Sequence, residues 1–135
     1  MMRMRWLLAL MAVLLAGNGL HMLFAPEHWY HSLQSVPHTG PLNAHFVRDI
    51  GCAYLASALG FAFAARRDEW RTPGLILALV FLGAHAGVHL WEALLGHAVA
   101  QHSGVIDAIG VYAPPLLALA VLMAVQLRRG KRQQP

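Results

Sequence analysis

The chain has 135 residues, of which 58% are hydrophobic and only 12% are charged. Soluble domains carry about 25% charged residues, so this composition argues against a soluble protein. The net charge of +4 does not indicate a nucleic-acid partner, because the basic residues stand in short groups beside apolar stretches, as they do at membrane flanks. The single cysteine, Cys52, excludes a disulfide within the chain.

Four apolar stretches have the length of about 20 residues that a membrane-spanning helix needs. They cover residues 6–25, 44–65, 74–95 and 104–127. Their polar interruptions are too few to form the full polar face of a soluble amphipathic helix. We therefore predict an all-α integral membrane protein, in which residues 1–135 form one domain, an antiparallel four-helix bundle. The first stretch resembles a signal peptide but has no good small-x-small cleavage site, so we expect an uncleaved anchor.

The connections between the stretches differ in length and chemistry. Residues 26–43 form the longer one: Pro26 suits the first position of a short interfacial helix, and residues 36–41 have turn chemistry. Pro114 and Pro115 fall inside the fourth stretch and should kink it. Gly83 and Gly87 form a small-xxx-small pair, where we expect another helix to approach closely or a second copy to dock.

Basic residues predict the orientation. Nine of the ten lie before the first stretch, between the second and third, or after the fourth, and Arg48 is the exception. The positive-inside rule places that side in the cytoplasm, together with both termini. We therefore expect a multi-pass protein of a plasma membrane. All nine histidines then fall in the outer half or the outer loops.

Several polar residues inside the stretches recur at helical spacing. His45, Asp49 and Cys52 share one helix face, and His85, His89 and Glu92 share another. Ionisable groups at membrane depth are costly, so they usually face the interior, pair with one another and mark a site. Four helices could each offer a polar group to one outer layer if these faces turn inward.

This layer allows several kinds of chemistry. His85 and His89, one turn apart, could chelate a transition metal with Glu92, and we assign these three residues to a candidate metal site. A candidate cofactor site comprises His45, Arg48, Asp49 and Asp107. Two histidines on different helices, such as His45 and His89, could instead clamp a haem.

Two other functions stay open. A His–carboxylate pair could perform acid–base chemistry on a lipid-phase molecule such as a quinone, as an enzyme or as an accessory subunit. Alternatively, the polar layer only orders the helices, for example through an ion pair of Arg48 with Asp49 or Asp107, in a structural or assembly protein. No catalytic residue can be named from the sequence, and whether the protein is an enzyme is left open.

One segment carries a family resemblance. A Trp29-Tyr30 element is followed by Thr39-Gly40-Pro41-x-Asn43-x-His45-Phe46-Val47-Arg48-Asp49-Ile50-Gly51. This pattern resembles that of a group of small uncharacterised bacterial membrane proteins, loosely similar in four-helix architecture to DoxX-like proteins. The resemblance implies a bacterial inner membrane as the location, and it implies no activity.

Overall fold

The computed structural model describes residues 2–33, 35–95 and 108–132, with side chains as far as Arg128, and every regular element in these ranges is helical. The α-helices are α1 (Met2–Phe24), α2 (Pro26–Ser32), α3 (Ala44–Arg66), α4 (Arg71–Leu94) and α6 (Ala113–Arg132). A short 3₁₀-helix, η1 (Val36–His38), precedes α3, and a π-helical turn, η2 (Ala108–Tyr112), precedes α6.

Local sequence explains the helix boundaries. Pro26 occupies the start of α2, where its missing N–H costs nothing, so the predicted short helix is present. The Asn43 side chain caps α3 by accepting a hydrogen bond from the Phe46 backbone N–H at 3.1 Å. η2 ends at Tyr112, two residues before Pro114, the first of two consecutive prolines in α6. Proline has no backbone N–H, so Pro114 and Pro115 cannot donate hydrogen bonds to the preceding turn. The helix accordingly changes from π-helical to α-helical next to these prolines.

Four helices within the described ranges are long and apolar enough to cross a membrane. They cover Met2–Phe24, Ala44–Arg66, Arg71–Leu94 and Ala108–Arg128, close to the four predicted stretches. Many of their large hydrophobic side chains are exposed, among them Leu14, Val80 and Leu119. Such outward apolar surface suits contact with lipid.

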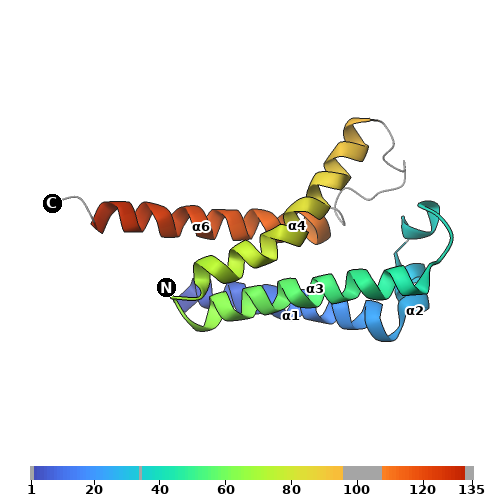
Figure 1. The fold of residues 1–135 in the computed structure, drawn as a ribbon, viewed down its shortest axis with the longest axis horizontal. Helices are drawn as coiled ribbons and strands as arrows, with labels where there is room; N and C mark the ends of the chain where they lie inside the picture. Colours follow the sequence, from blue (N-terminus) through green and yellow to red (C-terminus); the bar gives the residue numbers. More distant parts are fainter. Residues whose placement is uncertain (1, 34, 96–107, 133–135) are drawn as a thin grey trace.

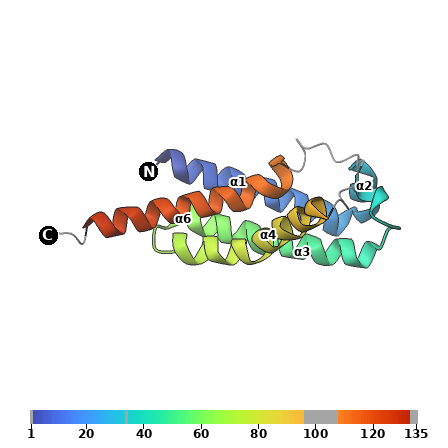
Figure 2. The same cartoon turned by 90° about the horizontal axis from the view of Figure 1, so that it is seen from above.

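The helices pack in chain order. α1 lies beside α3, α3 packs on α4, and α4 packs on α6 (Figures 1 and 2). Two glycine contacts set the first two crossings. A Cβ on Gly19 would come within 2.8 Å of the Gly51 carbonyl oxygen, and a Cβ on Gly60 would clash with the Gly74 carbonyl. Only glycine allows the backbones to approach this closely.

The predicted close approach at Gly83 and Gly87 is not made by any described helix. A Cβ on Gly87 would meet nothing within 4 Å, and one on Gly83 would reach only Leu79 of the same helix. The buried residues of α4 all lie in its first half, the last of them being Leu82. Beyond that point α4 rises away from α1 and α3 (Figure 1).

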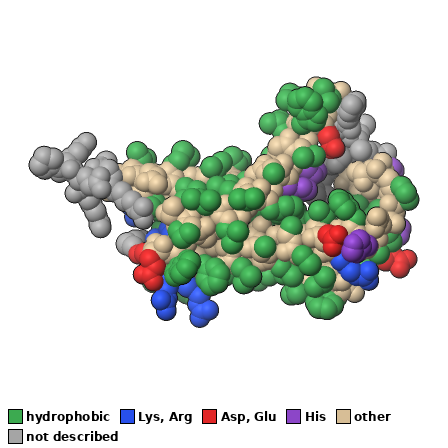
Figure 3. Space-filling model, in the orientation of Figure 1, with side chains coloured by type: hydrophobic (Ala, Val, Ile, Leu, Met, Phe, Trp, Pro, Cys, Tyr) green, Lys and Arg blue, Asp and Glu red, His purple; other side chains and the backbone are tan. Residues whose placement is uncertain are grey.

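The molecule has two chemically distinct ends. The start of α1, the α3–α4 connection and the end of α6 lie at one end, and α2 lies at the other (Figure 1). We call the first the arginine end, after Arg3, Arg5, Arg66, Arg67, Arg71 and Arg128, and the second the histidine end. On the face shown in Figure 3, histidine side chains gather toward the histidine end, with hydrophobic side chains along the length between.

One aspartate ties the arginine end together. Asp68 accepts hydrogen bonds from Arg5 of α1 at 2.7 Å and from Arg71 of α4 at 2.6 Å. These bonds from Arg5 and Arg71 lower the pKa of the Asp68 carboxyl below its ordinary value of 3.8. Arg71 is only 4% exposed, and Asp68 is the carboxylate that balances its buried charge.

Candidate functional site

Four side chains of α3 and α4 form an aromatic–histidine cluster, which consists of Tyr54, Phe81, His85 and His89. The His85 ring stacks on Phe81 with centroids 5.5 Å apart and meets the edge of Tyr54 at 6.0 Å. The His85 and His89 rings are 4.7 Å apart in a T-shaped arrangement. The predicted pairing of the two histidines on one helix face is therefore present, and it continues into aromatic residues.

The position of the cluster follows from the path of α4. Tyr54 is buried, whereas Phe81, His85 and His89 are half-buried, because α4 leaves α3 beyond Leu82. The cluster thus lies where a closely packed helix pair opens toward the histidine end. Planar aromatic rings and two imidazoles are brought together at this opening. This arrangement can stack against a flat molecule and form a hydrogen bond with it.

Sequence reasoning missed two members of this cluster. Tyr54 carried no signal beyond packing, because no spacing on its own helix linked it to the histidines. Phe81 precedes His85 by four residues, so extending the helical spacing by one turn would have found it.

Glu92, the carboxylate assigned to the metal site, lies three residues beyond the last member of the aromatic–histidine cluster. Glu92 is exposed near the end of α4, and no ion pair involving it is found among the described residues. In the part of the chain that the structure describes, no three His, Cys, Asp or Glu side chains come close enough to hold one metal ion. A three-residue metal site at His85, His89 and Glu92 stays a prediction.

His45 and Asp49 form a separate pair on α3. Their side chains are 3.4 Å apart, as the i, i+4 spacing predicts, but they are 87% and 60% exposed. Cys52, one turn further, is also exposed, whereas Tyr54 and Ser57 on the opposite face are buried. This pair therefore faces outward. Asp107, the remaining carboxylate of the predicted cofactor site, lies outside the described residues.

Arg48 contacts the end of α1. Its Nε donates a hydrogen bond to the backbone carbonyl of Leu23 at 3.3 Å. The last carbonyls of a helix lack partners and carry partial negative charge, so a guanidinium group stabilises this terminus. Arg48, which we assigned to the candidate cofactor site, therefore has a structural role at the end of α1.

The segment that carries the family resemblance builds a corner, which we define as residues 18–48 from the last turns of α1 to the first turn of α3. The Tyr30 hydroxyl donates to the Gly40 carbonyl at 2.5 Å, and Gly40 has a φ of 146° that favours glycine. The Trp29 indole N–H donates to the Asn18 side chain at 2.9 Å, which fastens α2 to α1.

The corner also contains a histidine pair. His21 Nε2 and His28 Nδ1 are 2.8 Å apart, so one imidazole donates to the other and joins α1 to α2. At least one of the two rings must be neutral for this bond, because two protonated imidazoles can only donate.

These features define an all-α protein with four helices long and apolar enough to span a membrane and a polar corner at one end. The chain belongs to the family described as a domain of unknown function, DUF4345, which matches residues 3–91. The matched part contains the corner and the aromatic–histidine cluster, and it ends before Glu92. No curated protein and no solved structure shows significant similarity to the chain.

Proposed function

We propose that this protein is a multi-pass protein of a bacterial inner membrane, with its arginine end in the cytoplasm and its histidine end toward the periplasm. The basic residues at the chain's start, at the α3–α4 connection and beyond α6 support this orientation under the positive-inside rule. The gathering of these segments at one end of the molecule is what a four-span topology requires (Figure 1). The DoxX-like architecture suggested by the sequence is consistent with this topology.

The geometry favours a binding function, in which the aromatic–histidine cluster binds a planar lipid-phase molecule such as a quinone. The stacking of His85 on Phe81 at 5.5 Å carries this proposal. Aromatic rings stack on a flat ligand, and an imidazole N–H can donate to a ligand carbonyl. Such a ligand would reach the cluster through the lipid, because α4 opens away from α3 there.

A transition metal is the second candidate ligand. The one-turn spacing of His85 and His89, with ring centroids 4.7 Å apart, is an arrangement that can chelate a metal ion. Haem clamped by His45 and His89 is less well supported, because His45 is 87% exposed and paired with Asp49.

Equilibrium binding of decylubiquinone to the detergent-purified full chain tests the proposal. We expect saturable binding of one molecule per chain, weakened about tenfold by His89→Gln or Phe81→Leu, which corresponds to roughly 1.4 kcal/mol. His38→Gln, at an exposed histidine of η1, is the control and should bind as the wild type does. Absence of saturable binding, or equal binding by all variants, would contradict it.

The same preparation separates the other candidates. Stoichiometric zinc or nickel in elemental analysis, lost in His85→Gln and His89→Gln, would favour the metal site. A Soret absorption band after haem reconstitution would favour haem. If the variants only lower stability and no ligand binds, the cluster is a packing element of a structural or assembly protein.

A further inference from the structure

A depression at the corner combines charged groups with apolar surface. It is open rather than enclosed, and its volume of about 610 Å³ falls within the range of roughly 300–1,000 Å³ typical of small-molecule sites. Its lining comes from the end of α1, α2, the following loop and the start of α3. Among the lining residues are Phe24, Glu27, His31 and Arg48.

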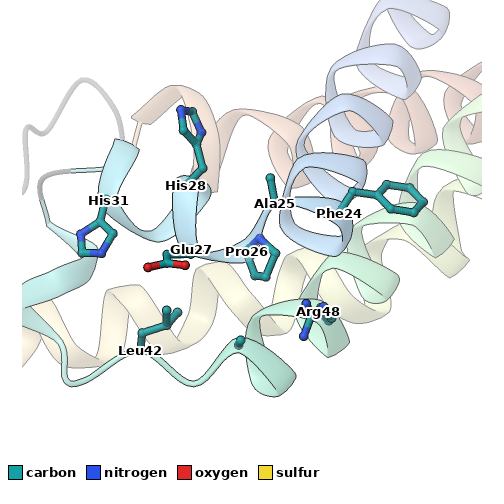
Figure 4. Close-up of a pocket in the computed structure, with 9 residues that line it drawn as sticks. Phe24, Ala25, Pro26, Glu27, His28, His31, Leu42 and Arg48 are labelled. Carbon is teal, nitrogen blue, oxygen red and sulfur yellow. The ribbon is translucent and has the colours of Figure 1, made fainter.

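Two opposite charges line this depression without pairing. Arg48 and Glu27 form no ion pair with any described residue, although both border the same space. Arg48 donates through Nε to the Leu23 carbonyl, which holds the guanidinium group in place and leaves its two terminal nitrogens for another partner. Glu27 and His31 lie at one end of the depression and Arg48 at the other (Figure 4).

The depth of the depression suits the level of lipid headgroups. Arg48 stands four residues into α3, which corresponds to about 6 Å along a helix that is apolar enough to span the membrane. Phe24, which also lines the depression, is 78% exposed. The depression therefore combines charged groups with exposed apolar surface beside them, as a lipid with a polar head and acyl chains requires.

We propose that the depression binds a zwitterionic phospholipid headgroup with a primary ammonium group, of the phosphatidylethanolamine class. Arg48 binds the phosphate, for which a guanidinium group is geometrically suited, and Glu27 accepts hydrogen bonds from the ammonium group. The acyl chains run along Phe24. This inference rests on the proposed membrane insertion and is independent of the ligand at the aromatic–histidine cluster.

Native mass spectrometry of the full chain in detergent, with dilauroyl lipids added, tests this proposal. We expect one phosphatidylethanolamine per chain, bound about tenfold more tightly than phosphatidylglycerol, which has the phosphate and lacks the ammonium group. Phosphatidylcholine should also bind more weakly, because its methylated ammonium cannot donate a hydrogen bond to Glu27. Inorganic phosphate should not displace the lipid; displacement would indicate a free-phosphate site and overturn the lipid proposal.

Matched variants test separately which part of the lipid headgroup Glu27 and Arg48 bind. Glu27→Gln should remove the preference for phosphatidylethanolamine over phosphatidylglycerol, whereas Glu69→Gln, at an exposed carboxylate of the arginine end, should not. Arg48→Gln should weaken both lipids about tenfold, and Arg66→Gln should weaken neither. If Arg48→Gln does not fold, Glu27→Gln still decides: an unchanged preference overturns the proposal. The quinone test at His89 is unaffected by either result.

Discussion

The arginine end and the histidine end of this protein are stabilised in different ways. At the arginine end, α3 and α4 touch backbone to backbone at Gly60 and Gly74, and Asp68 joins two helices through two arginines. At the histidine end, α1 and α3 still meet closely at Gly19 and Gly51, but α4 has left α3, and side-chain hydrogen bonds hold the corner. We call the histidine end the open end, because α4 leaves α3 on the way to it, and both proposed ligand sites lie toward this end.

The largest expected effect concerns the glycine crossing. Gly60→Ala would place a Cβ against the Gly74 carbonyl, where the contacting atom is backbone and cannot move aside cheaply. We expect the free energy of unfolding to fall by about 1–3 kcal/mol. Thermal unfolding in detergent, followed by circular dichroism, measures this loss.

Gly87→Ala is the matched control at the open end. A Cβ there meets nothing within 4 Å, so the higher helix propensity of alanine should leave stability unchanged or raise it by up to about 1 kcal/mol. Equal destabilisation by both substitutions would remove the contrast between the two ends.

The next largest loss of stability is expected from removing the N-terminal cap of α3. Asn43→Ala removes the acceptor of the Phe46 backbone N–H at the corner, which should cost about 1 kcal/mol. Asn43→Asp, which keeps a side-chain acceptor, should restore most of that stability in the same unfolding measurement. A loss of equal size in both variants would show that the cap does not hold the corner.

A smaller effect is expected from the bond between α2 and α1. A double-mutant cycle of Trp29→Phe and Asn18→Ala should give a coupling energy of about 0.6 kcal/mol, typical of polar pairs in membrane proteins. The two single variants and the double variant are compared by chemical denaturation. Additive single effects would mean that the indole–amide bond contributes nothing.

The smallest effect is the pH dependence of the arginine end. Because the folded protein lowers the pKa of Asp68 below 3.8, this carboxylate adds stability that is complete above that pH. The contribution is lost as the pH falls below 3.8 toward the folded-state value. The melting temperature of Asp68→Asn should therefore fall less than that of the wild type between pH 5 and about pH 3. Parallel curves would contradict this assignment.

The sequence predicted local structure well. Helix length, the short helix starting at Pro26, the turn containing Gly40 and the i, i+4 pairs His45–Asp49 and His85–His89 all follow from short-range rules, and the structure contains them. Each depends only on residues a few positions apart.

Which helix faces turn inward could not be predicted in the same way. In a membrane protein, both lipid-facing and core-facing positions are apolar, so periodicity does not distinguish them. The small-residue rule therefore favoured Gly83 and Gly87, whereas Gly60 and Gly74 form the crossing between α3 and α4. For the same reason the outward position of His45 could not be foreseen.

Photoaffinity labelling with an azido-substituted short-chain ubiquinone, followed by peptide mapping of the full chain, tests most directly whether the open end binds a ligand at the aromatic–histidine cluster. We expect the label on peptides of α3 around Tyr54 and of α4 from Phe81 to His89, with competition by unlabelled decylubiquinone. Labelling that spreads along the exposed apolar surfaces of α1 and α6, or that unlabelled quinone does not reduce, would contradict the proposed function.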